Sequence, residues 1–344
     1  MLVLGIETSC DETAVAVVKD NLILSNEVFL QADIYKEFGG VVPEIAARNH
    51  VEILPHLLEK ALKEAKTSLT KVDAIATTGG PGLIAGIIVG IMYGKTLSSA
   101  MNKKFIAVNH LEGHALIPKM TENLSYPYLL LLISGGHCQI IIVETLGNYY
   151  IIGRTTDDAI GESFDKVAKL LDLGYPGGPI IENYALKGNE KRYRFPRPLC
   201  KKNEYNFSFS GLKTAVKNQV NKIEILSKEN IYDICASFQY TVSEILNFKI
   251  LEAIKIFNLK FPNSRNVVIS GGVAANKYIR NKLDKSLENF GYKLFYPPIE
   301  LCTDNAVMIA YAGTERLKNG SYSNLDFEPR SRWNLDEIQY STIE

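Results

Sequence analysis

Residues 2–18 read LVLGIETSCDETAVAVV, and this stretch decides the fold. Its apolar runs at 2–6 and 13–18 have the length of short β-strands, and the polar residues between them form a turn. A similar unit recurs at 128–143, where two apolar runs flank Ser134-Gly135-Gly136-His137. The chain therefore contains a weak internal duplication of a strand–turn–strand unit.

Helix and strand patterns alternate outward from these two hairpins. Between them, the apolar periodicity predicts helices near 43–66 and 83–100 and buried strands near 73–77 and 105–108. This alternation is typical of an α/β protein. Beyond the second hairpin the pattern predicts a strand at 266–270 and helices near 161–171, 210–222, 229–259, 275–290 and 304–318.

The length of 344 residues exceeds what one hydrophobic core usually serves, since single cores stop growing at about 250–300 residues. We therefore expect two lobes, one formed by 1–108 and completed by a helix at 304–330, the other formed by 109–303. Lys plus Arg and Asp plus Glu both number 38. A nucleic-acid contact must then use a local basic patch, because a neutral chain exerts little long-range attraction on polyanions.

Cysteine usage favours a reducing cytoplasm, because the five cysteines are scattered and form no C-x-x-C pair. The N-terminus lacks the basic region and apolar run of a secretory signal. The uncharged stretch 74–94 contains Pro81 and six glycines, which predict strand, turn and helix rather than a membrane span.

Four of those glycines, at 82, 86, 90 and 94, form one ridge of a predicted helix. This ridge packs inside the protein or binds a helix of a partner.

His110 and His114 lie one turn apart on the same face if their segment is helical, an arrangement that suits a metal ion. Glu112 is not adjacent to the first histidine, so the H-E-x-x-H protease motif is absent. Asp304 is the candidate for a third, oxygen ligand, and such a set suits iron or zinc. The alternatives are a pair of structural histidines and a helix N-cap at Asp304.

Two small-residue loops follow apolar strands, at Ser134–His137 and at Ser270–Asn276. Backbone N–H groups of such loops reach anions, and the second loop also opens a helix, so together they suggest a nucleotide site. Structural turns are the alternative. The carboxylates at 157–165 would suit ribose hydroxyls or cap a helix, and residues 175–179 predict a rigid turn.

Cations gather between 187 and 202, interleaved with Tyr193 and Phe195. This composition is typical of a patch that tracks phosphates and stacks bases, although a solvated basic loop has the same appearance. The candidate RNA-binding residues are Lys191, Arg192, Arg194, Arg197, Lys201 and Lys202, with Lys187 beside them.

Seven motifs in order make the chain resemble the bacterial TsaD family of tRNA adenosine threonylcarbamoyltransferases, once described as O-sialoglycoprotein endopeptidases. The resemblance spans residues 2–333. Its motifs are Gly5–Thr13, Gly39–Glu44, His110-x-x-x-His114, Ser134–His137, Gly161–Lys166, Phe209–Lys213 and Cys302–Asn305.

The resemblance implies a two-lobed actin/Hsp70-like (ASKHA) fold with a mixed sheet flanked by helices in each lobe. It implies transfer of the threonylcarbamoyl group from threonylcarbamoyl-AMP to the exocyclic amine of the adenosine just 3′ of the anticodon, in tRNAs reading codons that begin with adenine. His110, His114 and Asp304 would hold one iron(II) per subunit, with zinc as a substitute in vitro. The substrate would contact Ile133, Ser134, Gly135, Gly136, His137, Asp165, Gly178, Glu182 and Asn276.

The resemblance also implies tRNA and two proteins as partners, a paralogous actin-like subunit (TsaB-like) and a small ATPase (TsaE-like), with neither membrane nor DNA. We hypothesise that Asp11 or Glu12 orients the attacking amine or accepts its proton. Three rival functions differ in chemistry. A glycoprotein endopeptidase needs a base beside the metal, a small-molecule kinase of this fold uses Mg²⁺ on carboxylates, and a nucleotide-binding scaffold has no need of an open metal site.

Overall fold

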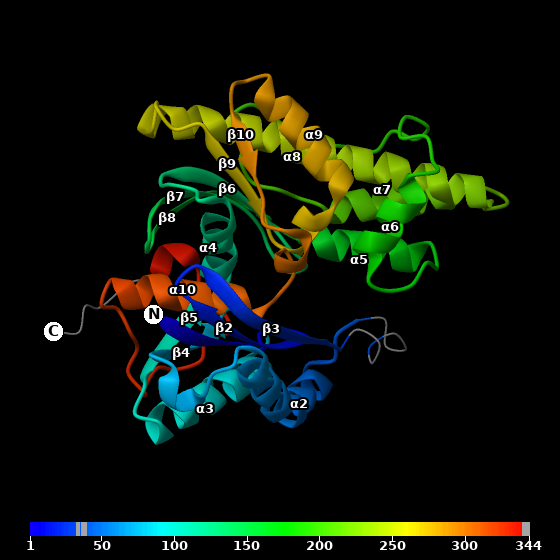
Figure 1. Cartoon of the computed structure of the whole chain (residues 1–344). Helices are drawn as coiled ribbons and strands as arrows, with labels where there is room; N and C mark the ends of the chain where they lie inside the picture. Colours follow the sequence, from blue (N-terminus) through cyan, green and yellow to red (C-terminus); the bar gives the residue numbers. More distant parts are fainter. Residues whose placement is uncertain (32–34, 36–39, 339–344) are drawn as a thin grey trace. The chain divides into compact units, whose positions relative to one another are not determined.

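The computed structural model describes residues 1–31, 35 and 40–338, so Gly39 of the motif at 39–44 lies outside the described residues. The chain divides into two compact units (Figure 1). The division falls after Ser125 rather than after residue 108, and 109–125 therefore belongs to the first unit. The first unit comprises Met1–Ser125, Thr145–Tyr149 and Asp304–Glu344; the second comprises Tyr126–Glu144 and Tyr150–Thr303.

The first unit is built on a five-stranded sheet in the order β3-β2-β1-β4-β5. Strands β1, β2 and β3 form an antiparallel meander, whereas β4 and β5 run parallel to β1. The strands are β1 (Leu2–Glu7), β2 (Glu12–Lys19), β3 (Leu22–Leu30), β4 (Ala74–Gly80) and β5 (Lys104–Asn109).

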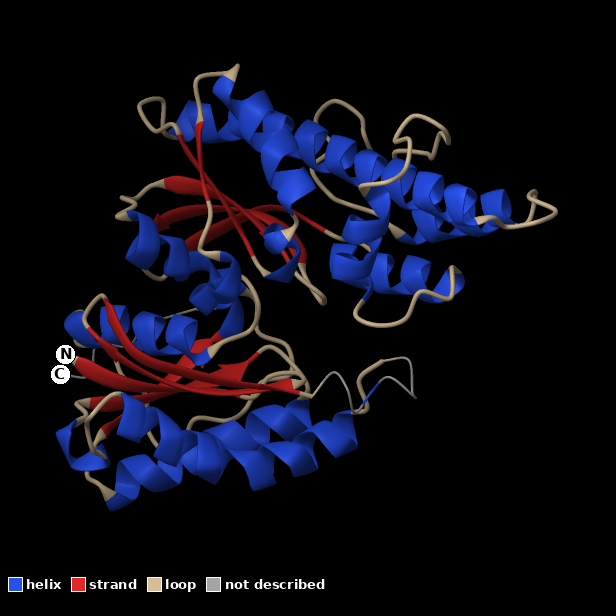
Figure 2. Ribbon diagram, turned by 45° about the vertical axis from the view of Figure 1, so that its right-hand side comes forward, coloured by secondary structure: helices blue, strands red, loops and turns tan. Residues whose placement is uncertain are grey.

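Helices cover both faces of this sheet (Figure 2). On one face, α2 (Pro43–Glu64) and α3 (Ile84–Ala100) bury the even-numbered side chains of β1, Leu4 and Ile6. On the other face lies α10 (Ala306–Lys318), with α4 (His110–Glu122) packed against it. Gly5 permits this contact, because a Cβ there would lie 2.3 Å from the carbonyl oxygen of Ala306. Two 3-10 turns, Leu69–Lys71 and Leu335–Glu337, complete the unit.

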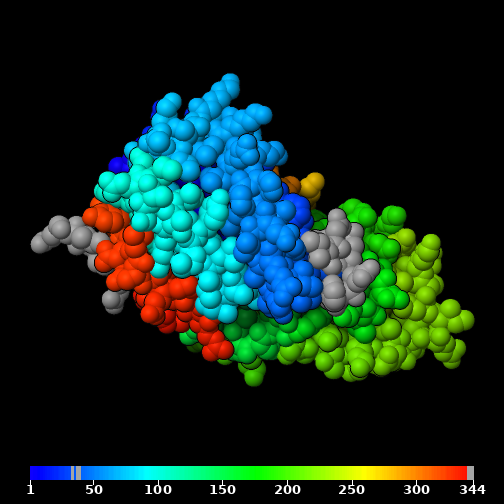
Figure 3. Space-filling model, turned by 90° about the horizontal axis from the view of Figure 1, so that it is seen from below, coloured from blue at the N-terminus to red at the C-terminus, as the bar shows by residue number. Residues whose placement is uncertain are grey.

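The glycine ridge of α3 faces inward. A Cβ at Gly90 would lie 2.3 Å from the hydroxyl oxygen of Thr8, and one at Gly94 would lie 2.2 Å from Thr77. The intramolecular alternative is therefore correct for these glycines. The opposite side of α3 exposes Ile84, Ile88 and Met92, and Figure 3 shows the surfaces of α2 and α3 (blue and cyan) next to one another.

The second unit repeats this topology, because its sheet has the order β10-β9-β6-β7-β8, with β6 and β7 antiparallel and β9 and β10 parallel to β6. The internal duplication predicted from the two hairpins is thus confirmed. Helices α5 to α9 share one apolar core with this sheet. The elements are β6 (Tyr128–Ile133), β7 (Cys138–Thr145), β8 (Asn148–Arg154), β9 (Asn266–Ser270), β10 (Lys293–Phe295), α5 (Ile160–Leu170), α6 (Gly177–Ala185), α7 (Ser210–Val220), α8 (Lys228–Lys260) and α9 (Lys277–Glu288), with 3-10 turns at Gly272–Ala275 and Ile299–Leu301.

The helices and strands predicted from periodicity are present with small shifts of their ends. The helix expected to complete the first lobe over 304–330 is shorter, because α10 ends at Lys318 and is followed by Asn319 and Gly320. The elements that the prediction omitted are β3, β8, β10 and α6, and α6 begins within the stretch predicted as a rigid turn. Helix α4 was considered only as a condition for the histidine pair, and the structure confirms that this segment is helical. All five cysteines are free. No helix among the described residues is long and apolar enough to cross a membrane.

Candidate metal centre

The two histidines are placed by the start of α4. Strand β5 ends at Asn109, whose buried side-chain oxygen accepts hydrogen bonds from the backbone N–H of Leu111 (2.9 Å) and Glu112 (3.4 Å). The same side chain donates to the carbonyl oxygen of Trp333 (2.9 Å). A capped start fixes where the helix begins. His110 is therefore its first residue, with His114 one turn later.

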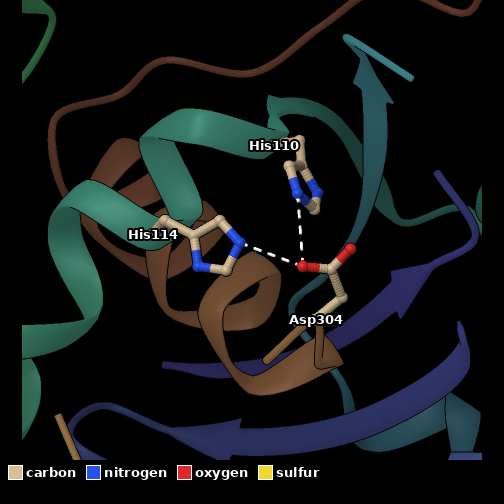
Figure 4. A group of neighbouring side chains, drawn as sticks. All are labelled: His110, His114 and Asp304. Carbon is tan, nitrogen blue, oxygen red and sulfur yellow. Dashed lines mark hydrogen bonds and ion pairs between the residues drawn. The ribbon is translucent and has the colours of Figure 1, made fainter. Parts of the chain in front are cut away.

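His110, His114 and Asp304 converge in the first unit (Figure 4). Asp304 Oδ1 lies 3.0 Å from His114 Nε2 and 3.5 Å from His110 Nε2, and the two rings stand edge to face with centroids 4.8 Å apart. One candidate ligand atom from each residue lies within 4.8 Å of the others. Ligands of one metal ion at about 2.0–2.2 Å lie roughly 3–3.5 Å apart, so this group could hold a metal.

Asp304 does not cap α10. The N-cap is Asn305, whose side-chain oxygen accepts from the backbone N–H of Met308 (3.0 Å). Glu112 lies on α4 between the two histidines, and its Oε1 accepts from the Tyr149 hydroxyl (2.7 Å). Burial raises the pKa of Glu112 to about 7. The side chains that converge as candidate metal ligands are those of His110, His114 and Asp304, whereas the Glu112 carboxylate is held by Tyr149.

Glu7, which was not among the predicted site residues, supports His110 from the end of β1. Its Oε2 lies 3.1 Å from His110 Nδ1 and accepts from the hydroxyl of Thr78, while its Oε1 accepts from the Ser9 N–H (2.5 Å). The Ser9 hydroxyl also lies 3.1 Å from His110 Nδ1. Metal-bound histidines commonly hydrogen-bond a carboxylate through their second nitrogen. A charged residue ending an otherwise apolar strand was the available sequence signal.

The charges in this group stabilise one another. Burial opposes ionisation of His110, but Asp304 and Glu7 outweigh it and raise the pKa of His110 well above its usual range. Burial likewise disfavours the Asp304 carboxylate, yet His110 and His114 hold the pKa of Asp304 well below its usual range. A metal binds the neutral imidazole, so an incoming cation would displace a proton from His110. Two nitrogens and one carboxylate fit a transition metal better than Mg²⁺ or Ca²⁺.

Asp11 and Glu12 follow Ser9 in the same turn, which is half-buried. Burial, together with the negative charges of Asp304 and Asp11, raises the pKa of Glu12 well above its usual range. Glu12, one of the two hypothesised proton acceptors, is therefore affected by the charge of Asp304, the carboxylate of the histidine–aspartate group.

The predicted substrate loops come together in the second unit. The carbonyl oxygen of Ser134 accepts from Gly161 N–H (3.1 Å), and that of Gly135 accepts from Glu162 N–H (3.3 Å). Gly161 allows this contact, because a Cβ there would lie 2.7 Å from Gly135 Cα. Gly271, at φ +94°, brings the second loop within reach of Ile133. Gly136 and Gly178 have open space where a Cβ would lie.

Three polar residues predicted to bind substrate also connect these loops. Asp165 accepts from Gly177 N–H (2.7 Å), and Glu182 accepts from Lys277 N–H (2.7 Å). Asn276 caps α9 by accepting from Ile279 N–H (2.9 Å), and its amide donates to Gln239 (2.8 Å). The prediction missed Gln239, a buried polar residue in the middle of α8.

The basic segment runs along α8 in the second unit. Asp233 of α8 accepts from Asn189 N–H (2.7 Å), and the buried Lys249 of α8 donates to the carbonyl oxygens of Leu199 and Glu204 (both 2.7 Å). Arg197 pairs with Glu244 at 3.4 Å. Among the described cations of this segment, those that are exposed and have no ion pair are Lys187, Lys191, Arg192, Arg194, Lys201 and Lys202. Tyr193 and Phe195 instead pack against the apolar core.

Comparison with sequence models of known protein families assigns this chain to one family. The model described as TsaD, tRNA N6-adenosine threonylcarbamoyltransferase, matches residues 22–311. The chain belongs to this family. A tRNA N6-adenosine threonylcarbamoyltransferase of Rickettsia bellii (strain OSU 85-389) is 54% identical over 338 residues, covering 98% of this chain and 99% of that protein. One of Rickettsia canadensis (strain McKiel) is 53% identical over 339 residues, with coverages of 98% and 99%. The resemblance to TsaD proteins is thereby confirmed.

Solved structures support the fold. Full-length HypF in its phosphate- and nucleotide-bound form aligns with a TM-score of 0.62 and 14% identity, over 94% of this chain and 47% of that one. Component A of the Acidaminococcus fermentans (R)-2-hydroxyglutaryl-CoA dehydratase aligns with a TM-score of 0.52 and 17% identity, over 90% and 96%. At these identities the similarity concerns the fold alone. The predicted actin/Hsp70-like α/β fold is confirmed.

Proposed function

We propose that this chain transfers the threonylcarbamoyl group from threonylcarbamoyl-AMP to the exocyclic amine of the adenosine just 3′ of the anticodon, in tRNAs reading codons that begin with adenine. The observation that carries the proposal is membership of the tRNA N6-adenosine threonylcarbamoyltransferase family over nearly the whole chain. The proposed compartment is the cytoplasm, where tRNA is found and thiols stay reduced.

In the proposed reaction the amine nitrogen attacks the carbonyl carbon of the threonylcarbamoyl group. A carbon–nitrogen bond forms, the bond from that carbon to the phosphate oxygen breaks, and AMP leaves with the electron pair. The attacking amine loses a proton, and Asp11 or Glu12 is the proposed acceptor. His110, His114 and Asp304 would hold one iron(II), or zinc in its place, and Glu7 would orient His110. When bound, such an ion supplies Lewis-acid stabilisation of developing negative charge.

The second unit is proposed to bind the adenylate. Backbone N–H groups of Ser134–His137 and of the loop before α9 would contact phosphate, and Asp165 and Glu182 would accept from ribose hydroxyls. The hydrogen bonds that join these loops in the free protein support the proposal, because a preorganised site loses little entropy on binding.

Replacing Gly161 with alanine tests the adenylate site. The added methyl group would overlap the backbone of Ser134 and Gly135, so the loop must shift away from α5. We expect the dissociation constant of a non-reactive adenylate analogue to rise roughly tenfold, about 1.4 kcal/mol. Calorimetric titration measures the constant. Metal content is the internal control and should not change, since the metal ligands belong to the other unit. Unchanged analogue affinity would remove the loop from the site.

The exposed cations along α8 are proposed to contact the tRNA backbone. The helix from Asp233 to Glu252 is about 28 Å long, and the basic segment is hydrogen-bonded near both of these residues, at Asn189 and at Asn203. Since Tyr193 and Phe195 pack on the core, the contact would be to phosphates without base stacking.

The double variant Arg192→Ser/Arg194→Ser tests this patch. We expect the dissociation constant for tRNA to rise roughly tenfold, with the slope of log affinity against log salt reduced by about 0.7–0.9 for each phosphate that the variant no longer neutralises. Filter binding at several salt concentrations measures both. Lys217→Ser/Lys222→Ser is the control with the same change of charge on α7 and the turn after it. Equal effects of the two double variants would show only a general dependence on charge.

Partner proteins remain part of the proposal. We propose that the paralogous actin-like subunit (TsaB-like) binds the apolar stripe Ile84, Ile88 and Met92 of α3, whose side chains are 45%, 44% and 54% exposed. Exposed apolar residues at i, i+4 and i+8 are typical of a helix that binds another helix. A small ATPase (TsaE-like) is the second proposed partner.

The transferase and its rivals differ in their products. Incubation with threonylcarbamoyl-AMP and tRNA should release one AMP for each threonylcarbamoyladenosine recovered from digested tRNA, measured by mass spectrometry. AMP release in the absence of tRNA product would point to simple hydrolysis. Cleavage of a glycoprotein, or phosphate transfer from ATP to a small molecule, would instead support the endopeptidase or the kinase.

A further inference from the structure

We propose that His50, a buried side chain of α2, positions the turn Ser9–Glu12 for the transfer reaction. It is a positioning residue, because it acts on Cys10 and Thr13 rather than on substrate. The inference rests on the proposed function, in which this turn carries Asp11 and Glu12, the candidate proton acceptors. The main observation behind this inference is the hydrogen bond between the His50 imidazole and the Cys10 carbonyl oxygen.

His50 is completely buried and is hydrogen-bonded at both ring nitrogens. Its Nε2 lies 3.1 Å from the carbonyl oxygen of Cys10, which can only accept, so Nε2 carries the hydrogen. Its Nδ1 then accepts, from the Thr13 hydroxyl at 2.7 Å and the Gln31 amide at 3.3 Å. The neutral imidazole therefore contacts the chain on both sides of Asp11 and Glu12.

A second layer of hydrogen bonds holds the ring. Gln31, also buried, donates to the Thr13 hydroxyl at 3.3 Å. Its amide oxygen accepts from the Tyr35 hydroxyl (2.6 Å) and from Asn49 (3.0 Å). A fully satisfied buried network of this kind selects one rotamer of its members. Burial also lowers the pKa of His50, which favours the neutral form that this pattern requires.

The start of α3 holds the other side of the turn. The backbone N–H of Leu83 donates to the carbonyl oxygen of Ser9 (2.7 Å), and the Thr8 hydroxyl donates to that of Gly86 (2.9 Å). The glycines of the α3 ridge permit this approach, since a Cβ at Gly82 would lie 2.4 Å from the Ser9 oxygen. Ser9 in turn contacts His110. His50 thus completes a clamp on the segment that carries the proposed acceptors.

Two amide substitutions separate this role from a general contribution to folding. Glutamine can place its side-chain nitrogen where Nε2 of His50 lies, whereas asparagine reaches only the position of Nδ1. We expect His50→Gln to keep the single-turnover transfer rate within about threefold of wild type and His50→Asn to lower it roughly 10- to 100-fold, as small displacements of reacting groups do. The control is His56→Gln, on the exposed side of the same helix.

Two further measurements accompany the rate. Metal content should stay the same in His50→Gln and His50→Asn. The denaturant midpoint is recorded for both variants, because the loss of a buried hydrogen bond lowers stability, and the transfer rates are compared at the same folded fraction. Hydrogen exchange of the peptide containing Ser9–Glu12, followed by mass spectrometry, should be faster in His50→Asn and unchanged in His50→Gln. Equal rates in the two variants, or a rate that only follows the folded fraction, would overturn the proposal. If wild type transfers nothing, the proposed function fails, and exchange alone then decides whether His50 holds the turn.

Discussion

Replacing Asp304 with alanine is expected to remove stoichiometric metal binding and to slow threonylcarbamoyl transfer by at least about 10³-fold, because a Lewis-acid ion supplies several kcal/mol of charge stabilisation. Asp304 provides the only oxygen donor of the three-residue group, and its Oδ1 faces both His114 and His110. Without it, two imidazoles remain to bind the ion.

The test loads each protein with iron(II) under anaerobic conditions and measures bound metal by mass spectrometry before a single-turnover assay. Asp326→Ala is the matched control, an exposed aspartate of the same unit. The unfolding midpoint is recorded as well, since Asp304 pairs with two histidines. An Asp304→Ala protein that transfers at the wild-type rate without bound metal would contradict the role assigned to this group.

Neutralising the proposed proton acceptor should have the second largest effect. Asp11→Asn and Glu12→Gln preserve side-chain size but remove the basic oxygen. We expect one of them to lower the transfer rate about 100-fold at neutral pH, within the range for general-base catalysis. Metal content should be unchanged in both variants.

The pH profile distinguishes a base from a structural carboxylate. Transfer by wild type should rise with pH until the acceptor is ionised, and this rise should disappear in the affected variant. Glu52→Gln, at an exposed position of α2, is the control. Near-wild-type rates in both Asp11→Asn and Glu12→Gln would remove the two residues from the mechanism.

Much of the fold could be predicted from the sequence, because the central strands are continuously apolar and the main helices have a regular apolar periodicity. The runs at 2–6 and 128–133 are apolar throughout, as strands in the middle of a covered sheet must be. Helix α6 was missed because it begins within Pro-Gly-Gly-Pro, residues that predict a turn although proline is well tolerated in the first turn of a helix. Strand β3 lies at a sheet edge and mixes polar with apolar residues, and β10 has only three residues.

Some residues of the candidate site could likewise be predicted from the sequence, and others could not. The spacing of His110 and His114 was sufficient to predict a metal pair, because four residues make one helical turn. Glu7 was read as part of a polar turn, and only the sheet places it beside His110 and Thr78. The rings of Tyr193 and Phe195 were expected to stack on bases but are part of the core packing, which depends on tertiary contacts that periodicity does not report.

The central claim is that this chain modifies one adenosine of tRNA, and single-turnover transfer from preformed threonylcarbamoyl-AMP tests it most directly. The substrates are an unmodified tRNA with adenosine just 3′ of the anticodon and the same tRNA with guanosine there. Both are tested with wild type and with His110→Ala/His114→Ala, with the proposed partner proteins present. We predict transfer only by wild type and only to the adenosine-bearing tRNA. No transfer under these conditions, or equal transfer to both tRNAs, would contradict the claim.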